Sequence, residues 1–183
     1  MSLQQWIHAP IAVEFVDGSP MAIVQWITQG YGDTLPDGGT WLRPGCWIRP
    51  TNRPELVERK LAVIFADRAA VRSWRFVAPA EIPTDRTYRN AWMDTGTSVQ
   101  HDMTKARALH RNMLRNERVE RMLVLDQEWM AATRDNDRAA IVDVDRRKQE
   151  LLDITDDPRI DAATSTEELK QITLPPMQVN AWR

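Results

Sequence analysis

The stretch 102–133, DMTKARALHRNMLRNERVERMLVLDQEWMAAT, decides the fold of the larger part of this 183-residue chain. It contains neither glycine nor proline, and most of its residues are good helix formers. Apart from one weak turn around Asn116, apolar residues recur at steps of three or four, the spacing of one helix face: Ala106, Leu109, Met113, Met122, Leu125 and Trp129. The pattern predicts a long amphipathic helix that begins near a cap at Asp102 or Thr104.

Further helices are predicted after this stretch. The short polar connector RDND (residues 134–137) leads into a second helix, from about residue 137 to 153, with apolar residues available for packing: Ala140, Ile141, Val144, Leu151 and Leu152. Asp157 followed by Pro158 is typical of a helix start. Ser165 and Glu168 have the spacing of a capping box, which predicts a last short helix over residues 166–172. Residues 174–183 are expected to form an extended tail.

Charge placement favours an antiparallel hairpin of the two long helices. A reversal at residues 134–136 brings three pairs together: Arg121 with Gln149, Arg118 with Leu152, and Arg111 with Arg159. Arginines at helical spacing then lie beside acidic residues of the returning chain: Arg107, Arg111, Arg115, Arg118 and Arg121 beside Glu150, Asp153, Asp156, Asp157 and Asp161. Each exposed pair contributes only about 0.2–1 kcal/mol, but the pattern favours the hairpin over a straight rod.

The first half of the chain has a different character. Six of the seven glycines lie before residue 46, so turns are frequent there. Residues 11–16 (IAVEFV) and 21–27 (MAIVQWI) are rich in β-branched and aromatic residues, and the intervening DGSP predicts a β-hairpin. Residues 61–65 (LAVIF) are interpreted as a buried strand, and residues 74–77 as another.

The expected fold class is therefore α+β. A small β-containing N-terminal module precedes a long antiparallel helical hairpin and short terminal helices. The expected divisions are a β-rich module over residues 1–80, a connector over 81–101, the helical hairpin module over 102–173, and the extended tail over 174–183.

Composition excludes several classes of protein. The chain is 43% hydrophobic and 27% charged, the balance of an ordinary globular protein. A net charge of −2 argues against a protein that coats polyanions. The single cysteine, Cys46, excludes an internal disulfide framework and a cysteine-rich zinc site. Apolar runs of only a few residues predict no membrane span, and MSLQQWIHAP at the N-terminus does not have the pattern of a signal peptide.

No recognisable catalytic or metal-binding motif occurs. Nucleophile elbows, phosphate-binding loops and dinucleotide fingerprints are all missing. His101 and His110 are nine residues apart, a spacing that does not place two imidazoles on one helix face, and we interpret His110 as a helix-surface or interface residue. We therefore expect no enzymatic activity, no catalytic residues, no cofactor and no metal.

Arginine and tryptophan offer binding surfaces. The arginine face of the first long helix is able to bind nucleic acid phosphates, but pairing within the hairpin explains the same residues and is favoured. Trp41 and Trp47 lie in a segment that also contains Arg43, Arg49 and Arg53, a composition that suits base or sugar stacking, core packing or a protein interface. The protein interface is favoured, because Trp and Arg are the enriched anchors there. Trp182 in the tail PPMQVNAWR is interpreted as part of an arm that docks on a neighbour.

Residues 83–173 resemble a module of small virion-associated proteins from the tail and tail-fibre region of tailed bacteriophages. The resemblance rests on DRTYRNAW (residues 85–92), on DMTKARALHR (102–111), and on RKQELLDITDDPRIDAATSTEELKQI (147–172). It implies a structural role without catalytic residues. In that role residues 85–92 form a hinge, with Tyr88 and Trp92 anchoring one face while Arg86 and Arg89 bond carbonyls or acidic partners.

The resemblance leads to an expected function. The chain is expected to be a non-enzymatic structural or adaptor component of a bacteriophage virion, in the tail or tail-fibre attachment region. Other virion proteins are its expected partners, in a symmetric homo-oligomer, without a membrane and without nucleic acid. The alternatives are a tail-fibre assembly chaperone absent from the mature particle, and a nucleic-acid-binding or regulatory module that uses the arginine face. Seven residues are the interface candidates: Trp41, Trp47, Arg86, Tyr88, Arg89, Trp92 and Trp182.

Overall fold

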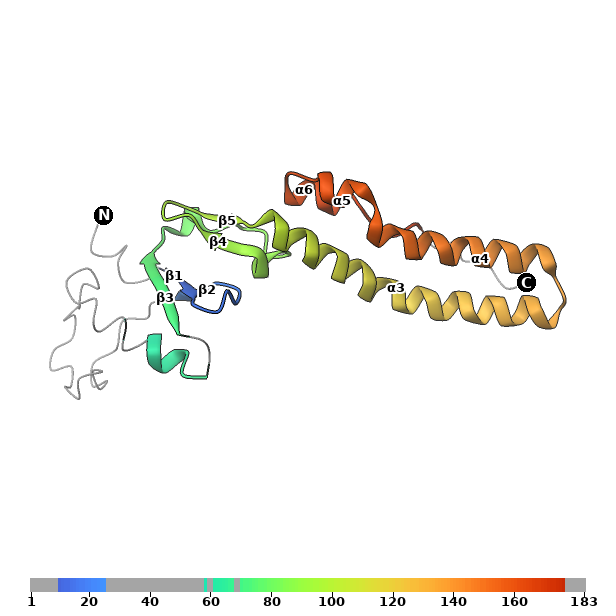
Figure 1. Cartoon of the computed structure of the whole chain (residues 1–183), viewed down its shortest axis with the longest axis horizontal. Helices are drawn as coiled ribbons and strands as arrows, with labels where there is room; N and C mark the ends of the chain where they lie inside the picture. The colour runs from blue at the N-terminus through green and yellow to red at the C-terminus, as the bar shows by residue number, and fades with distance from the viewer. Residues whose placement is uncertain (1–9, 26–57, 59–60, 68–69, 177–183) are drawn as a thin grey trace. The chain divides into compact units, whose positions relative to one another are not determined.

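The fold is α+β, as the sequence predicts, with small antiparallel sheets followed by long helices (Figure 1). The computed structural model describes residues 10–25, 58, 61–67 and 70–176. By its contacts the chain divides into two compact units, Met1–His101 and Asp102–Arg183.

A three-stranded antiparallel sheet organises the first unit. Its strands are β1 (Pro10–Phe15), β2 (Ala22–Gln25) and β3 (Val71–Phe76), in the order β2-β1-β3. The predicted β-hairpin is confirmed, since β1 and β2 pair directly. In the turn between them Gly18 has a φ of +74°, a left-handed conformation that glycine adopts without strain.

The central strand β1 is buried on both faces. Side chains alternate along a strand. Ile11, Val13 and Phe15 therefore belong to one apolar cluster with Leu61, whereas Ala12 belongs to a second cluster, with Val77, Trp92 and Val99. The unit thus has a small core on each side of its sheet.

Residues 61–65 are not the predicted strand, because residues 61–64 are helical. The Phe65 N–H donates to the Leu61 carbonyl at 2.9 Å, a helical hydrogen bond. Leu61 is buried and the Phe65 ring meets Phe15 edge-on at 5.0 Å, while Val63 is 77% exposed. The strand prediction was wrong because a short apolar run has no periodicity that separates strand from helix.

Residues 81–101, expected as a connector, are built into the first unit. They include the end of the 3-10 helix η2 (Pro79–Glu81) and the 3-10 helix η3 (Arg89–Ala91). The strands β4 (Trp92–Asp94) and β5 (Val99–His101) follow and pair with each other. Residues 81–101 are held in the first unit because Trp92 and Val99 pack into the same apolar cluster as Ala12 of β1.

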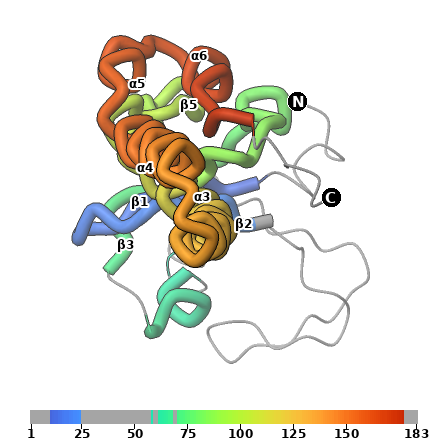
Figure 2. Tube along the Cα trace, turned by 90° about the vertical axis from the view of Figure 1, so that its right-hand side faces the viewer, coloured from blue at the N-terminus to red at the C-terminus, as the bar shows by residue number. Residues whose placement is uncertain are grey.

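The second unit is the predicted helical hairpin. Its long arms are α3 (Met103–Arg134) and α4 (Arg138–Asp153), which lie side by side, as the end-on view in Figure 2 also shows. Both predicted helix starts are confirmed, and each has an aspartate cap: the Asp102 carboxylate accepts from the N–H groups of Thr104 and Lys105, and Asp137 accepts from that of Ala140. Local sequence therefore defines both helix starts.

Short helices follow, and the last two of them lie at the predicted places. They are the 3-10 helix η4 (Ile154–Asp156), α5 (Pro158–Ala162) and α6 (Thr166–Lys170). Asp157 caps α5, and the Ser165 hydroxyl accepts from the Glu168 N–H at the start of α6. The predicted last helix was two residues too long. Of the tail, only residues 174–176 are described, and Leu174 is buried.

The buried face of α3 differs from the predicted one. It consists of Ala106, His110, Leu114, Leu125 and Ala132. Met113 and Trp129, expected on this face, are 43% and 37% exposed. Apolar residues occur on every face of α3. Their spacing in the sequence therefore does not predict which of them contact α4 and the short helices.

Candidate interaction surfaces

Tyr88 and Trp92 anchor the 85–92 segment from within the first unit. Tyr88 is completely buried and Trp92 is 6% exposed. Both contact His101: the Trp92 Nε1–H donates to His101 Nε2 at 3.1 Å, and the Tyr88 ring meets the imidazole edge-on, with centroids 6.5 Å apart. These two interface candidates are therefore buried side chains that hold the 85–92 segment in the first unit.

Arg86 and Arg89, from the same segment, lie on the surface. Both are exposed, and among the described residues neither guanidinium has a hydrogen-bond or ion-pair partner. The three other interface candidates, Trp41, Trp47 and Trp182, lie outside the described residues.

A groove of about 800 Å³ brings these arginines next to the edge of the sheet. It is lined by Asp17, by residues 19–23, by Asp67, and by four residues of the 86–92 segment, Arg86, Arg89, Asn90 and Trp92. Met21 and Ile23 pack against the cluster that contains Trp92, so the groove has an apolar floor. Sequence reasoning identified the arginines but missed the groove, because its sides are far apart in the chain.

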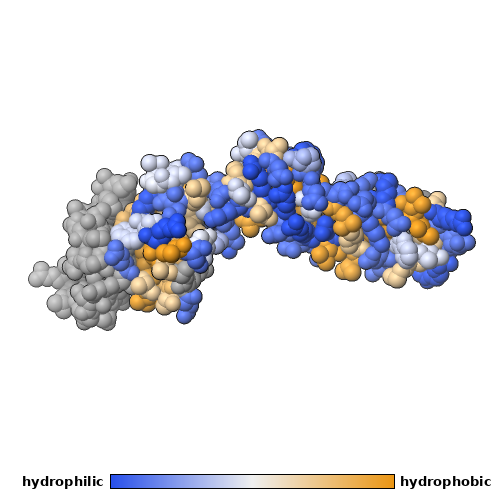
Figure 3. Space-filling model, viewed as in Figure 1, coloured by the Kyte–Doolittle hydropathy of each residue, from blue (hydrophilic) through white to orange (hydrophobic). Residues whose placement is uncertain are grey.

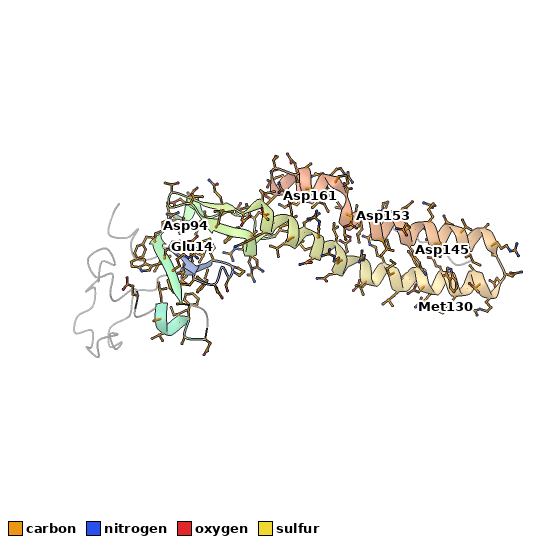
Figure 4. The ribbon with its side chains drawn as sticks, in the orientation of Figure 1. Glu14, Asp94, Met130, Asp145, Asp153 and Asp161 are labelled. Atoms are coloured by element: carbon orange, nitrogen blue, oxygen red, sulfur yellow. The ribbon has the colours of Figure 1, made fainter. Side chains whose placement is uncertain are left out.

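A charged network fixes β3 and β4 to η2. Arg75 Nε lies 2.8 Å from both Asp94 carboxylate oxygens, and its Nη1 lies 2.8 Å from Glu81. The Ala78 N–H also donates to Glu81; together with Arg75 it holds the pKa of the Glu81 carboxyl below its usual range. In Figure 4 Asp94 lies near Glu14, whose carboxylate accepts from the Asp94 N–H at 3.4 Å. The network pairs the charges of Arg75, Glu81 and Asp94 with one another, while Arg75 Nη2 is buried without a hydrogen-bond partner.

In the second unit the arginines of α3 bind the returning chain, mainly through carbonyls. Arg107 donates to the Ala163 carbonyl at 2.8 Å, and Arg118 to that of Leu152 at 3.5 Å. Arg121 donates to the Pro175 carbonyl. The Arg118 contact confirms the predicted reversal near residues 134–136.

The predicted pairing of these arginines with acids is correct only for Arg111. It donates to Asp161 at 2.7 Å as well as to the Thr155 carbonyl at 3.1 Å. Arg115 donates to Asn112 on its own helix. The difference has a physical cause, since carbonyls at helix ends and bends lack backbone partners and accept from guanidinium groups.

A second set of ion pairs lies away from the turn of the hairpin, between residues 126–128 of α3 and residues 147–148 of α4. Arg147 pairs with Glu128, and both side chains are largely buried. Lys148 lies 2.8 Å from Asp126, and its Nζ lies 5.6 Å from the centroid of the Trp129 ring. These contacts join α3 to α4.

An apolar stripe lies on the outer face of α3. It consists of Val119, Leu123 and Met130, which are 57%, 59% and 56% exposed. Steps of four and seven residues place them on one helix face, opposite the buried Leu114 and Leu125. Figure 4 shows Met130 on the side of α3 turned away from α4, and Figure 3 shows apolar patches on the polar surface of the hairpin. We call these three residues the outer stripe.

Comparison of the chain with protein family models, curated proteins and solved structures gives no match. Within the described ranges, no three His, Cys, Asp or Glu side chains form a group suited to a metal ion. None of the helices described combines the length and apolar character that crossing a membrane requires.

Proposed function

We propose that this chain is a non-enzymatic structural or adaptor component of a tailed-bacteriophage virion, in the tail or tail-fibre attachment region. The bacteriophage setting rests on the sequence resemblance over residues 83–173. The role in protein–protein contact rests on the surfaces described above.

The outer stripe is the observation that carries the proposal. Its three large apolar side chains are each more than half exposed on a helix whose opposite face is already buried. Full burial of such a side chain contributes about 1.5–3 kcal/mol relative to exposure in water. A complex in which a neighbouring protein covers the outer stripe is therefore substantially stabilised. A symmetric oligomer repeats this contact around its axis.

The arginines of α3 support this function over nucleic-acid binding. Phosphate binding requires guanidinium groups that are available to the backbone of the nucleic acid. Arg107, Arg111 and Arg121 are instead engaged with carbonyls of the same unit. Binding of phosphates would have to compete with these hydrogen bonds.

Mass spectrometry of purified particles tests the proposal. We expect the chain in intact virions at a symmetric copy number. We expect Leu123→Asp to reduce its incorporation, because a carboxylate on the outer stripe is costly to bury. Val142→Asp is the matched control, since it places the same charge at a 68% exposed aliphatic position of α4. Presence in infected cells but absence from particles would favour the assembly chaperone and refute the virion role.

A further inference from the structure

We propose that the groove of the first unit binds an extended segment of a partner protein that carries an acidic side chain, with the carboxylate placed between Arg86 and Arg89. The inference deepens the proposed function, on which its biological setting rests, by assigning the surface and the chemistry of one partner.

The edge of the sheet favours an extended occupant. Among the described strands, the single neighbour of β2 is β1, so β2 is an edge of the three-stranded sheet. Ala22 and Ile23 of this strand line the groove. An edge strand presents backbone N–H and C=O groups that a peptide strand is able to pair with.

The groove floor favours apolar side chains at alternate positions of that segment. Met21 and Ile23 are partly buried against the cluster of Trp92. Successive side chains of a strand point to opposite faces, so every second residue of the bound segment faces this floor. The hydrogen bond from Trp92 to His101 fixes the indole that supports it.

The two unpartnered arginines of the groove favour an acidic occupant. Asp17 is already satisfied, because its carboxylate accepts from the Ser19 N–H at 2.9 Å and from the Ser19 hydroxyl at 2.6 Å. The lining has two carboxylates, Asp17 and Asp67, and the two guanidinium groups of Arg86 and Arg89, which have no hydrogen-bond or ion-pair partner among the described residues. Guanidinium groups bind carboxylates through strong charge-assisted hydrogen bonds, so two arginines without a partner among the described residues favour an acidic side chain in the occupant.

Peptide binding to the full-length chain tests this assignment. The probes are two fluorescent peptides of equal length, one alternating valine with glutamate and the other alternating valine with lysine. We expect fluorescence anisotropy to show tighter binding of the Val-Glu peptide. We expect the double variant Arg86→Glu/Arg89→Glu to weaken that binding about tenfold or more, since two charge-assisted contacts are lost, and to bind the Val-Lys peptide better than the natural chain does.

The control is Arg134→Glu/Arg138→Glu, which makes the same charge change at two exposed positions of the helical unit. It should leave both affinities unchanged, and circular dichroism checks that both double variants are folded. Equal binding of the two peptides, or Val-Glu binding that survives the Arg86/Arg89 change, would overturn the inference. So would self-association of the chain that the Arg86/Arg89 change abolishes, because the occupant would then be a second copy. Since this measurement uses the purified chain and the virion measurement uses particles, the two proposals fail separately.

Discussion

His110 is a residue whose environment differs from the one its sequence position indicates. We expected it on the helix surface or in an interface, but it is 5% exposed. Its Nε2 lies 2.9 Å from the carbonyl oxygen of Ile172, so it joins α3 to the chain just beyond α6. The interpretation was wrong because the residues that cover His110 lie about sixty positions further along the chain.

The burial of His110 makes the helical unit sensitive to pH. Burial lowers the pKa of His110 below its ordinary value of 6.5, and the nearby positive charge of Arg111 lowers it further, against the opposing effect of the Ile172 carbonyl. The neutral imidazole is thus favoured in the folded state. Its contribution to stability is present above pH 6.5 and is lost as the pH falls through the folded-state pKa.

We therefore predict that the free energy of unfolding of the natural chain falls as the pH is lowered below about 6.5, by at most about 1.4 kcal/mol per pH unit from this one proton. The variant His110→Gln keeps a hydrogen-bond donor but does not titrate, so it should lack this component. Urea unfolding followed by far-ultraviolet circular dichroism at several pH values measures the difference. Parallel pH profiles of the two proteins would contradict the prediction.

At the scale of elements, α3 has two apolar faces with different roles. The inner face packs within the hairpin and the outer stripe is exposed. The inner face stabilises the unit, whereas the outer stripe is available to a partner. Substitution of one leucine from each face separates the two roles.

We predict that Leu114→Ala, at a side chain that is 3% exposed, lowers the free energy of unfolding by about 2–5 kcal/mol. Leu123→Ala, at a 59% exposed side chain, should change it by no more than about 0.5 kcal/mol. Thermal or urea denaturation of the purified variants measures both. A large loss of stability in Leu123→Ala would mean that the outer stripe is part of the core of the unit.

At the scale of the whole molecule, the chain is two units, each with its own core. In the described part of the helical unit, caps, arginine contacts and buried residues all come from residues 102–176. The core of the first unit joins the β1 strand to residues as distant in sequence as Val99. Such separate cores are typical of parts that fold independently.

We predict that a fragment of residues 102–183, produced alone, retains the helical circular dichroism expected from α3 and α4. It should also unfold in a cooperative transition. The Leu114→Ala substitution should shift this transition in the fragment as it does in the full chain. A fragment without helical signal would mean that the first unit is required to fold the hairpin.

How much the sequence predicts depends on how local the interactions are. Asp102, Asp137, Asp157 and Ser165 cap their helices by hydrogen bonds to residues two or three positions further on, and all four were predicted as caps or helix starts. The β1–β2 hairpin is equally local. Residues 61–65 were misassigned because their helical form depends on Leu61 and Phe65 reaching the distant β1 strand.

The sequence by itself determined the α+β class, the helix starts and the reversal of the hairpin. These features follow from interactions between residues close along the chain, which spacing reveals. Only the tertiary structure decided which face of α3 is buried, where the α3 arginines donate, and that Arg86 and Arg89 share a groove with β2. Each of these features depends on contacts between segments that are distant in the sequence. Such contacts determine which side chains are buried and which free carbonyls accept hydrogen bonds.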